Sequence, residues 1–270
     1  MTASLTHSYR LSWLLALLAG FAPLRNLAEP IPVRHLEGVE HGFLSLSTKE
    51  GQVVAVGDLL QNVHGDRVTS HLTFRFKDGS IDDETAIFTQ RGNFRLISDR
   101  HIQKGRSFPH PLDVAIDVAA GQVTVRSTGK DGKEETKTEH LDLPADLYNG
   151  LVTSIAKNVI PANPETTVSM VVATPKPRLI KLAISPGGKE TVSIAGFRRQ
   201  AIKYEIKFEL GGVAGVVAPL VGKQPPNVQI WIVGGEIPTF LREEGPLYEG
   251  SPSYTILQVG PTWPKASRSE

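Results

Sequence analysis

Glycine-containing turn signals recur along the first half of the chain every 11 to 16 residues, at Gly65, Gly79, Gly92, Gly105, Gly121 and Gly132. The residues between them alternate in polarity. In the stretch 71–77, Leu72, Phe74 and Phe76 point to one side and the polar residues between them point to the other. A period of two, interrupted by short polar turns, predicts an antiparallel meander with one buried face. The Asp78–Gly79 pair suits a two-residue hairpin turn of type I′.

One segment has a helical pattern instead. Leu147, Leu151, Ile155 and Val159 are spaced four residues apart, and Pro161 follows them. This spacing places the apolar side chains on one face of a helix, and proline cannot continue a helix. We therefore expect one α-helix near 145–160, packed on the sheet by its apolar face.

Strand patterns resume after this segment. Residues 167–171 and 179–184 are strand candidates, Pro186–Gly188 is expected to be a turn, 202–210 alternates strictly, and 228–233 with 236–241 form an expected hairpin. The predicted fold class is mainly β: a large curved antiparallel meander, half-barrel or barrel-like, packed on one helix.

The N-terminus has the pattern of a secretory signal peptide. Arg10 precedes a mostly apolar run over 11–22. As a helix, this run reaches about 18 Å, against the roughly 30 Å hydrocarbon core of a bilayer. A short apolar run behind a basic residue is typical of an exported protein, with cleavage after Ala28 or after Ala22. A buried N-terminal helix and a short membrane anchor are the alternatives.

The predicted organisation has three parts. They are a signal peptide over 1–28, a single β-rich domain over 29–260 and a loosely ordered tail over 261–270. The expected location is extracytoplasmic, either periplasmic or secreted, after cleavage of the signal peptide.

Composition excludes several classes of protein. The 29 basic residues nearly balance 28 acidic ones, so the chain lacks the positive field of a nucleic-acid-binding protein. Cysteine is absent, which excludes disulfides, thiolate metal sites and cysteine nucleophiles. We expect no cofactor and no nucleic-acid partner.

The sequence contains neither a Gly-x-Ser-x-Gly elbow nor a Walker phosphate loop. Asp82 and Glu84 share one face of a predicted strand, and paired carboxylates perform acid–base chemistry when burial raises one pKa. Nothing in the sequence indicates burial, so we expect a solvated acidic turn. No catalytic residue is predicted, although burial of Asp82 or Glu84 in a cleft would favour an enzyme.

The histidines lack the spacing of metal ligands. His64, Asp66 and His71 flank a turn where they could converge across a hairpin, but no His-Glu-x-x-His motif is present. We expect surface or edge histidines and no metal site. The set beyond the signal peptide is His35, His41, His64, His71, His101, His110 and His140.

The segment Gly211–Gly222 has no charged or polar side chain. It is too short to span a membrane as a helix and too rich in glycine for an ordinary central strand. One interpretation is a pliant apolar flap over a lipid-like ligand or against a membrane; the other is a buried loop or strand pair in the core. The first interpretation predicts these ligand-contacting residues: Phe74, Phe76, Phe88, Phe94, Val213, Val216, Val217, Leu220 and Trp231.

Three runs in the last part of the chain are distinctive: 218–226 (Ala-Pro-Leu-Val-Gly-Lys-Gln-Pro-Pro), 231–235 (Trp-Ile-Val-Gly-Gly) and 244–248 (Glu-Gly-Pro-Leu-Tyr). Together they resemble an uncharacterised family of secreted bacterial β-rich proteins, which implies no known activity. More distantly, a signal peptide, a long curved sheet and one helix resemble the periplasmic lipoprotein-carrier half-barrel. In that family a sheet wraps a helix and shelters acyl chains, and the resemblance is one of fold alone.

Three function classes follow from the sequence. The first is a non-catalytic extracytoplasmic protein that binds or carries an apolar, lipid- or acyl-like ligand in the concave face of the sheet. Its expected partners are that ligand and, transiently, a membrane or a lipoprotein. The second is an exported hydrolase-like enzyme using carboxylates or histidine on the sheet face. The third is an outer-membrane β-barrel, disfavoured by 7% aromatic residues and by the predicted helix.

Overall fold

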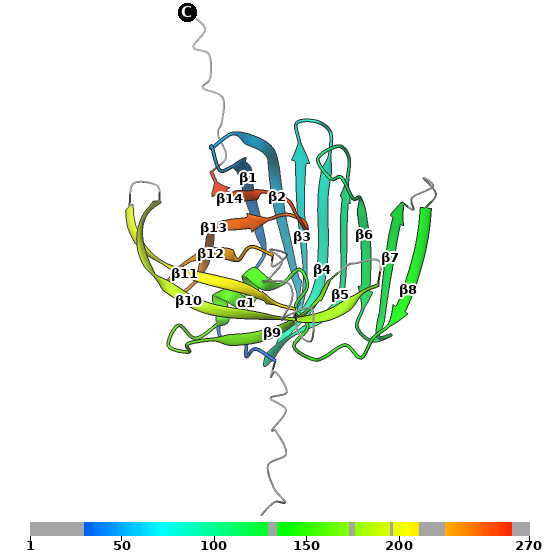
Figure 1. Ribbon diagram of the computed structural model, residues 1–270. Coiled ribbons are helices and arrows are strands. Elements are labelled where there is room, and N and C mark those ends of the chain that lie inside the picture. The colour runs from blue at the N-terminus through cyan, green and yellow to red at the C-terminus, as the bar shows by residue number, and fades with distance from the viewer. Residues whose placement is uncertain (1–29, 129–133, 173–175, 195–196, 211–224, 261–270) are drawn as a thin grey trace, which may run out of the picture.

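A computed structural model describes residues 30–128, 134–172, 176–194, 197–210 and 225–260, and the structural statements below concern these residues. They contain fourteen strands and one short α-helix (Figure 1). The elements are β1 (Glu40–Thr48), β2 (Val53–His64), β3 (Arg67–Phe76), β4 (Ile81–Arg91), β5 (Asn93–Lys104), β6 (Leu112–Asp117), β7 (Gln122–Thr128), β8 (Glu134–His140), α1 (Val152–Asn158), β9 (Thr166–Val172), β10 (Arg178–Ile194), β11 (Phe197–Glu209), β12 (Val228–Val233), β13 (Thr239–Pro246) and β14 (Ser253–Val259).

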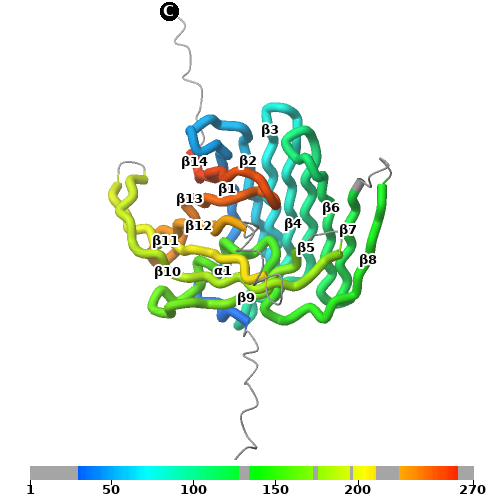
Figure 2. Tube along the Cα trace, in the orientation of Figure 1, coloured from blue at the N-terminus to red at the C-terminus, as the bar shows by residue number. Residues whose placement is uncertain are grey.

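All fourteen strands belong to one antiparallel sheet, which confirms the predicted fold class. The strand order is β8-β7-β6-β5-β4-β3-β2-β1-β14-β13-β12-β11-β10-β9. The sheet is not closed, because β8 and β9 each have a neighbour on one side only. It consists of two meanders, β1–β8 and β9–β14, joined by the pairing of β1 with β14. Figure 2 shows this junction as the place where the first and last strands of the chain meet.

The glycine turns of the first meander lie where the sequence predicts them. Gly65, Gly79, Gly92 and Gly121 each have a positive φ and each separate two consecutive strands. Glycine adopts this backbone conformation without the steric cost that a Cβ atom imposes. The turns therefore set the length of each strand from β2 to β7.

The helix is shorter than its apolar pattern predicts. The expected range near 145–160 contains α1 over Val152–Asn158 only, and turns occupy the residues before it. Gly150 has a φ of +68°, which a right-handed helix does not accommodate. Leu147 and Leu151 are nevertheless as buried as Ile155, so their spacing indicated burial correctly. No helix within the described ranges is long and apolar enough to cross a membrane.

The expected turn at Pro186–Gly188 is wrong. β10 continues through these residues, and its pairing with β11 shifts register between Pro186 and Gly188. This irregularity inserts an extra residue into one strand, and Gly188 takes a φ of +116° there. The two strands then remain paired as far as Ile194 and Phe197.

The chain passes from one edge of the sheet to the other through the segment 141–165, because β8 and β9 are consecutive in sequence and at opposite edges. This segment contains α1. In Figure 1, β9 to β12 cross in front of the wall formed by β3 to β6, with α1 between them. Side chains from both layers and from α1 form one main core, which includes Phe88, Ile155 and Ile206.

Two smaller apolar clusters accompany the main core. One contains Leu46, Phe74 and Phe108, and the other contains Ala201, Trp231 and Val233. Phe240 is partly buried and packs against both the main core and the Leu46 cluster. The two clusters and the core thus extend packing along the sheet instead of concentrating it at one centre.

Gly57 is predicted to be essential for packing between β2 and β3. A Cβ atom there would lie 2.5 Å from Cε1 of Phe74, a side chain that is only 2% exposed. Because crowding a packed core costs about 1–3 kcal/mol, we expect Gly57→Ala to lower the free energy of unfolding by that amount. Gly38→Ala is the control, since nothing lies within 4 Å of its added Cβ. Urea denaturation measures both, and equal stabilities would contradict the prediction.

Candidate functional site

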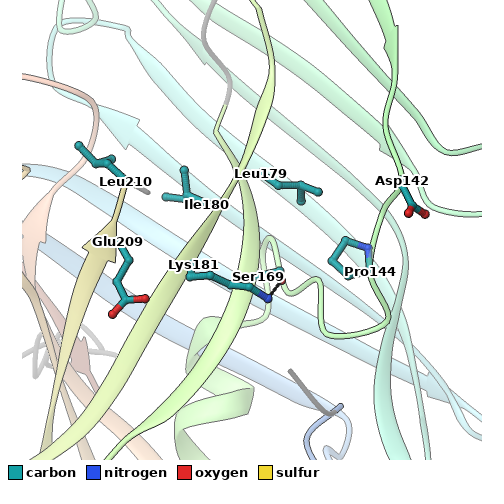
Figure 3. A pocket seen from close by; sticks show the side chains of 8 residues that line it. All are labelled: Asp142, Pro144, Ser169, Leu179, Ile180, Lys181, Glu209 and Leu210. Carbon is teal, nitrogen blue, oxygen red and sulfur yellow. Dashed lines mark hydrogen bonds between the residues drawn. The ribbon is translucent and has the colours of Figure 1, made fainter. Parts of the chain in front are cut away.

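A depression of about 230 Å³ lies at one end of β9, β10 and β11 (Figure 3). Its lining combines apolar with charged residues: Asp142, Pro144, Ser169, Leu179, Ile180, Lys181, Glu209 and Leu210. Leu179 and Lys181 point to the opposite face of β10 from Leu182, which belongs to the main core. Leu179 is 38% exposed, so the depression offers apolar surface to solvent.

A hydrogen-bonded network fixes the lysine of the depression. Nζ of Lys181 donates to Oγ of Ser169 at 2.7 Å and to Oδ2 of Asp146 at 3.1 Å. Oγ of Ser169 in turn donates to Oδ2 of Asp146 at 2.9 Å. Asp146 is 1% exposed, so the ammonium group is the countercharge that its burial requires. Lys181 is committed to this ion pair, and Asp142 and Glu209 leave the rim negatively charged.

The predicted ligand-contacting aromatic residues occupy three different places. Phe88 and Phe94 contact each other in the main core, with ring centroids 6.0 Å apart. Phe74 and Phe76 belong to the Leu46 cluster. Trp231 lies in the third cluster, on the opposite face of β12 from the core residues Ile230 and Ile232. All five side chains are at most 8% exposed.

The remaining predicted ligand residues, Val213, Val216, Val217 and Leu220, lie outside the described residues, as does the signal peptide. The depression ends at Leu210, directly before that apolar segment. Ser169 and Lys181 are not predictable as site residues, because lone polar residues in apolar strand candidates form no recognisable motif.

The expectation of a solvated acidic turn at Asp82 and Glu84 is wrong. Asp82 is 8% exposed, and both side chains point to the same face of β4 as Ala86, which is fully buried. The cause is the turn before β4. The backbone NH of Phe76 donates to the carbonyl of Ser80, so the loop has three residues instead of the two expected for Asp78–Gly79.

This single extra loop residue decides which face the carboxylates occupy. Asp82 pairs with Phe74, an inward-pointing residue, whereas a two-residue loop would pair it with Arg75. A shift of one residue moves every side chain of a strand to the other face. Asp83 instead lies on the opposite face, where its Oδ2 is 2.8 Å from Nε2 of His71.

Asp82 and Glu84 belong to an interior cluster of ionisable groups, together with Asp99, His101 and Glu243. Nε2 of His101 is 2.7 Å from Oδ1 of Asp82, and Nε2 of Gln103 donates to Oδ2 of Asp82 at 3.0 Å. His101 is therefore not the surface or edge residue that the sequence predicts, since its side chain is 27% exposed and packed among carboxylates. Glu243 comes from β13 and faces β4 across the curved sheet, where its charge and that of Glu84 interact.

The pKa values of Glu84, Asp99, His101 and Glu243 are all raised in this cluster. Burial raises the pKa of Glu243 to about 7, and the nearby charge of Glu84 adds to this. Burial, followed by the charge of Glu84, raises the pKa of Asp99 well above its usual range. Burial alone would lower the pKa of His101, but the hydrogen bond to Asp82 and the surrounding carboxylates raise it to about 9. His101 is thus an imidazolium at neutral pH.

Gly150 brings the segment before α1 against this cluster. A Cβ atom there would lie 2.7 Å from Cβ of Ala86 and 2.8 Å from Oδ1 of Asp99. Asp99 is 3% exposed, and its Oδ1 has no hydrogen-bond partner among the described residues. Interior carboxylates with raised pKa values are typical of sites that hold or transfer protons.

Other candidate groups have structural partners. Ser154 and Lys157 have a Ser-x-x-Lys spacing on α1, but Nζ of Lys157 donates to Oε2 of Glu37 at 2.8 Å. Within the described ranges, no group of three or more His, Asp or Glu side chains is arranged to hold a metal ion.

Comparisons with known proteins leave the family open. No family model matches the chain, and no curated protein matches it. A solved structure from Brucella abortus, described as a beta-barrel-like protein of domain of unknown function DUF1849, matches with a TM-score of 0.49 and 9% identity. The match covers 83% of this chain and 97% of that one. Such a distant likeness assigns neither family nor ligand, and the resemblance to the lipoprotein carrier stays a prediction.

Stability is predicted to fall as the pH rises from 5 to 9. In the unfolded chain Glu243 and His101 titrate near 4.5 and 6.5, and in the folded protein near 7 and 9. The folded state therefore binds more protons than the unfolded state in this window, so a rising pH favours unfolding. Urea denaturation at several pH values measures the slope, and a stability that rises from pH 5 to 9 would contradict it.

A neutral replacement of Glu243 separates its contribution to the pH dependence of stability from that of the other titratable groups. Glu243→Gln carries no charge at any pH, so its stability relative to the wild type is expected to increase from pH 5 to pH 8. The gain should reach about 1–3 kcal/mol, because each pH unit between the two pKa values corresponds to about 1.4 kcal/mol and the side chain is partly exposed. Glu249→Gln, at an exposed turn, should stay parallel to the wild type.

Proposed function

We propose that this chain is an extracytoplasmic, non-catalytic protein that binds an uncharged apolar molecule, such as a lipid or an acyl chain. The observation that carries the proposal is the depression beside β10, where Leu179, Leu210 and Pro144 surround a lysine already neutralised by Asp146. Binding sites for apolar ligands combine such surface with a few fixed polar groups. The signal-peptide pattern at the N-terminus supports the extracytoplasmic location.

The charges at the rim favour an uncharged ligand. Lys181 is paired with Asp146, while Asp142 and Glu209 form no ion pair within the described residues. A free carboxylate or phosphate would meet this uncompensated negative charge, which disfavours anionic ligands. We place the ligand at this depression and not among Phe74, Phe76, Phe88, Phe94 and Trp231, because those side chains are at most 8% exposed.

A volume of about 230 Å³ is below the 300–1,000 Å³ of typical small-molecule pockets. The depression therefore suits one part of a longer apolar ligand. The segment Gly211–Gly222, which follows Leu210 directly, remains the predicted source of further contacts, through Val213, Val216, Val217 and Leu220.

Binding of the uncharged apolar dye Nile red tests the proposal. We expect the wild-type protein to enhance its fluorescence. Leu179→Asp should weaken binding at least tenfold, because burying a leucine side chain contributes about 1.5–3 kcal/mol. Leu257→Asp is the matched control, since Leu257 on β14 has the same 38% exposure and lies far along the sheet.

Two outcomes would contradict the ligand-binding proposal: no dye binding by the wild type, or an equal loss in both variants. Circular dichroism shows whether each variant keeps its β structure. Purification from the extracytoplasmic fraction, with the N-terminus sequenced, checks the location. A chain that still begins at Met1 in the cytosol would contradict export.

We infer a hydrolase-like enzyme as the second candidate, on the observation that Asp82, Glu84, Asp99 and His101 meet in the interior. Asp99, a carboxylic acid with a raised pKa near the imidazolium of His101, is a suitable proton donor. On a panel of nitrophenyl esters and glycosides, Glu84→Gln should then lower any turnover at least a hundredfold. Asp83→Asn, one residue away on the opposite face, should not; the absence of turnover in the wild type would contradict the enzyme.

A further inference from the structure

The hairpin of β10 and β11 extends beyond the rest of the sheet. From Gly187 to Ile194 and from Phe197 to Gln200, all side chains are exposed except Val192, which is partly exposed. Figure 1 shows this paired ribbon rising away from the body of the protein. The next residue, Ala201, is fully buried against Trp231 and Val233, so the ribbon leaves the packed structure there.

A two-stranded ribbon without a packed face gains little stability in water. Here the pairing nevertheless continues to Ile194 and Phe197, on either side of the two-residue tip. Charged edges and polar tips are the usual way in which proteins keep such an element soluble. Besides charged residues, the end of this ribbon carries the exposed apolar side chains of Ile194 and Phe197, which indicates a binding surface.

Ile194 and Phe197 are paired directly across the ribbon, so both side chains lie on the same face. Their exposed fractions are 36% and 64%. The next pair on that face is Val192 with Arg199, and the guanidinium of Arg199 lies 5.7 Å from the ring centroid of Phe197. The end of the ribbon thus combines apolar surface with a cation held beside it.

The ribbon is also positively charged. Its exposed part carries Lys189, Arg198 and Arg199 against a single acid, Glu190. Glu190 is already engaged at the base of the ribbon, where its Oε2 accepts a hydrogen bond from Nε1 of Trp231 at 2.9 Å and lies 3.9 Å from Arg242. The whole chain has a formal charge of only +1, so this local excess is not a general property of the protein.

We propose that the tip of the β10–β11 ribbon docks on an anionic lipid bilayer. Phe197 and Ile194 enter the boundary between headgroups and acyl chains, and Arg198 and Arg199 contact the lipid phosphates. Aromatic residues and arginines occupy this boundary because each has an apolar part and a polar part. Attraction of basic residues to anionic lipids supplies the charge complementarity.

The proposal does not depend on the ligand site. Leu179 and Ile194 lie near opposite ends of β10, separated by about 50 Å of strand at the usual rise per residue. A protein that binds an apolar molecule at one end of this strand would meet a membrane with the other.

Sedimentation with lipid vesicles tests the proposal. The purified protein is mixed with vesicles of phosphatidylglycerol and phosphatidylcholine, or of phosphatidylcholine alone. The wild type and all variants begin at the same residue. We expect the wild type to bind the anionic vesicles at least tenfold more tightly than the neutral ones. Phe197→Ser and the double variant Arg198→Glu with Arg199→Glu should each reduce this binding at least tenfold.

Two matched controls carry the same chemical changes elsewhere. Ile237→Ser alters a more exposed apolar residue, at 82%, in the turn between β12 and β13. The double variant Arg67→Glu with Arg91→Glu reverses the charge of two exposed arginines, at the first residue of β3 and the last residue of β4. Both controls should bind anionic vesicles within twofold of the wild type.

The proposal is overturned if the wild type does not bind anionic vesicles or if the controls lose binding as strongly as the tip variants. It is also overturned if gel filtration shows that the tip variants dissociate a dimer while vesicle binding is unchanged, since the tip would then bind a second copy. Ile194→Ser provides a second test if Phe197→Ser fails to fold. Nile red binding should be unchanged in the tip variants, and Leu179→Asp should keep its vesicle binding, so the two proposals fail separately.

Discussion

The pairing of β1 with β14 is the contact on which the rest of the structure depends. Six consecutive residue pairs, from Phe43 with Val259 to Thr48 with Tyr254, join the first meander to the second. Without them each meander would have another unpaired edge, and the main core would lose one of the two layers that enclose it. Leu46, on β1, is fully buried at this junction.

The segment between β8 and β9 completes the interior by satisfying backbone groups of both layers. The side chain of Asn149 accepts a hydrogen bond from the NH of Val171 and donates one to its carbonyl, which extends the edge of β9. Oη of Tyr148 accepts from the NH of Ile31 and donates to the carbonyl of Phe94. Buried polar groups are tolerable only when they are hydrogen-bonded in this way. The segment therefore satisfies backbone groups at the sheet as well as filling the space beside it.

The strands were predictable from the sequence, and the interior chemistry was not. Alternation and glycine turns determine strand positions locally, which is why β9 and β12 lie close to their predicted ranges, 167–171 and 228–233. The face of β4 depends on one extra residue in the loop at Asp78–Gly79, and a dipeptide does not distinguish the two loop lengths. Asp99 joins Glu84 through the register of β5 with β4, and Glu243 joins it from β13, far along the sheet; no local pattern encodes either placement.

The central position of the terminal strands also bears on how the chain folds. Phe43 and Val259 are roughly two hundred residues apart in sequence, and closing so long a loop costs entropy before the pairing contributes any stability. Such non-local pairing slows folding, and the junction of the two meanders cannot form until β14 has been synthesised. A nascent chain without its last strand would therefore expose both edges of an unfinished sheet. Under the export proposed above, this delay would keep the chain unfolded until its synthesis is complete.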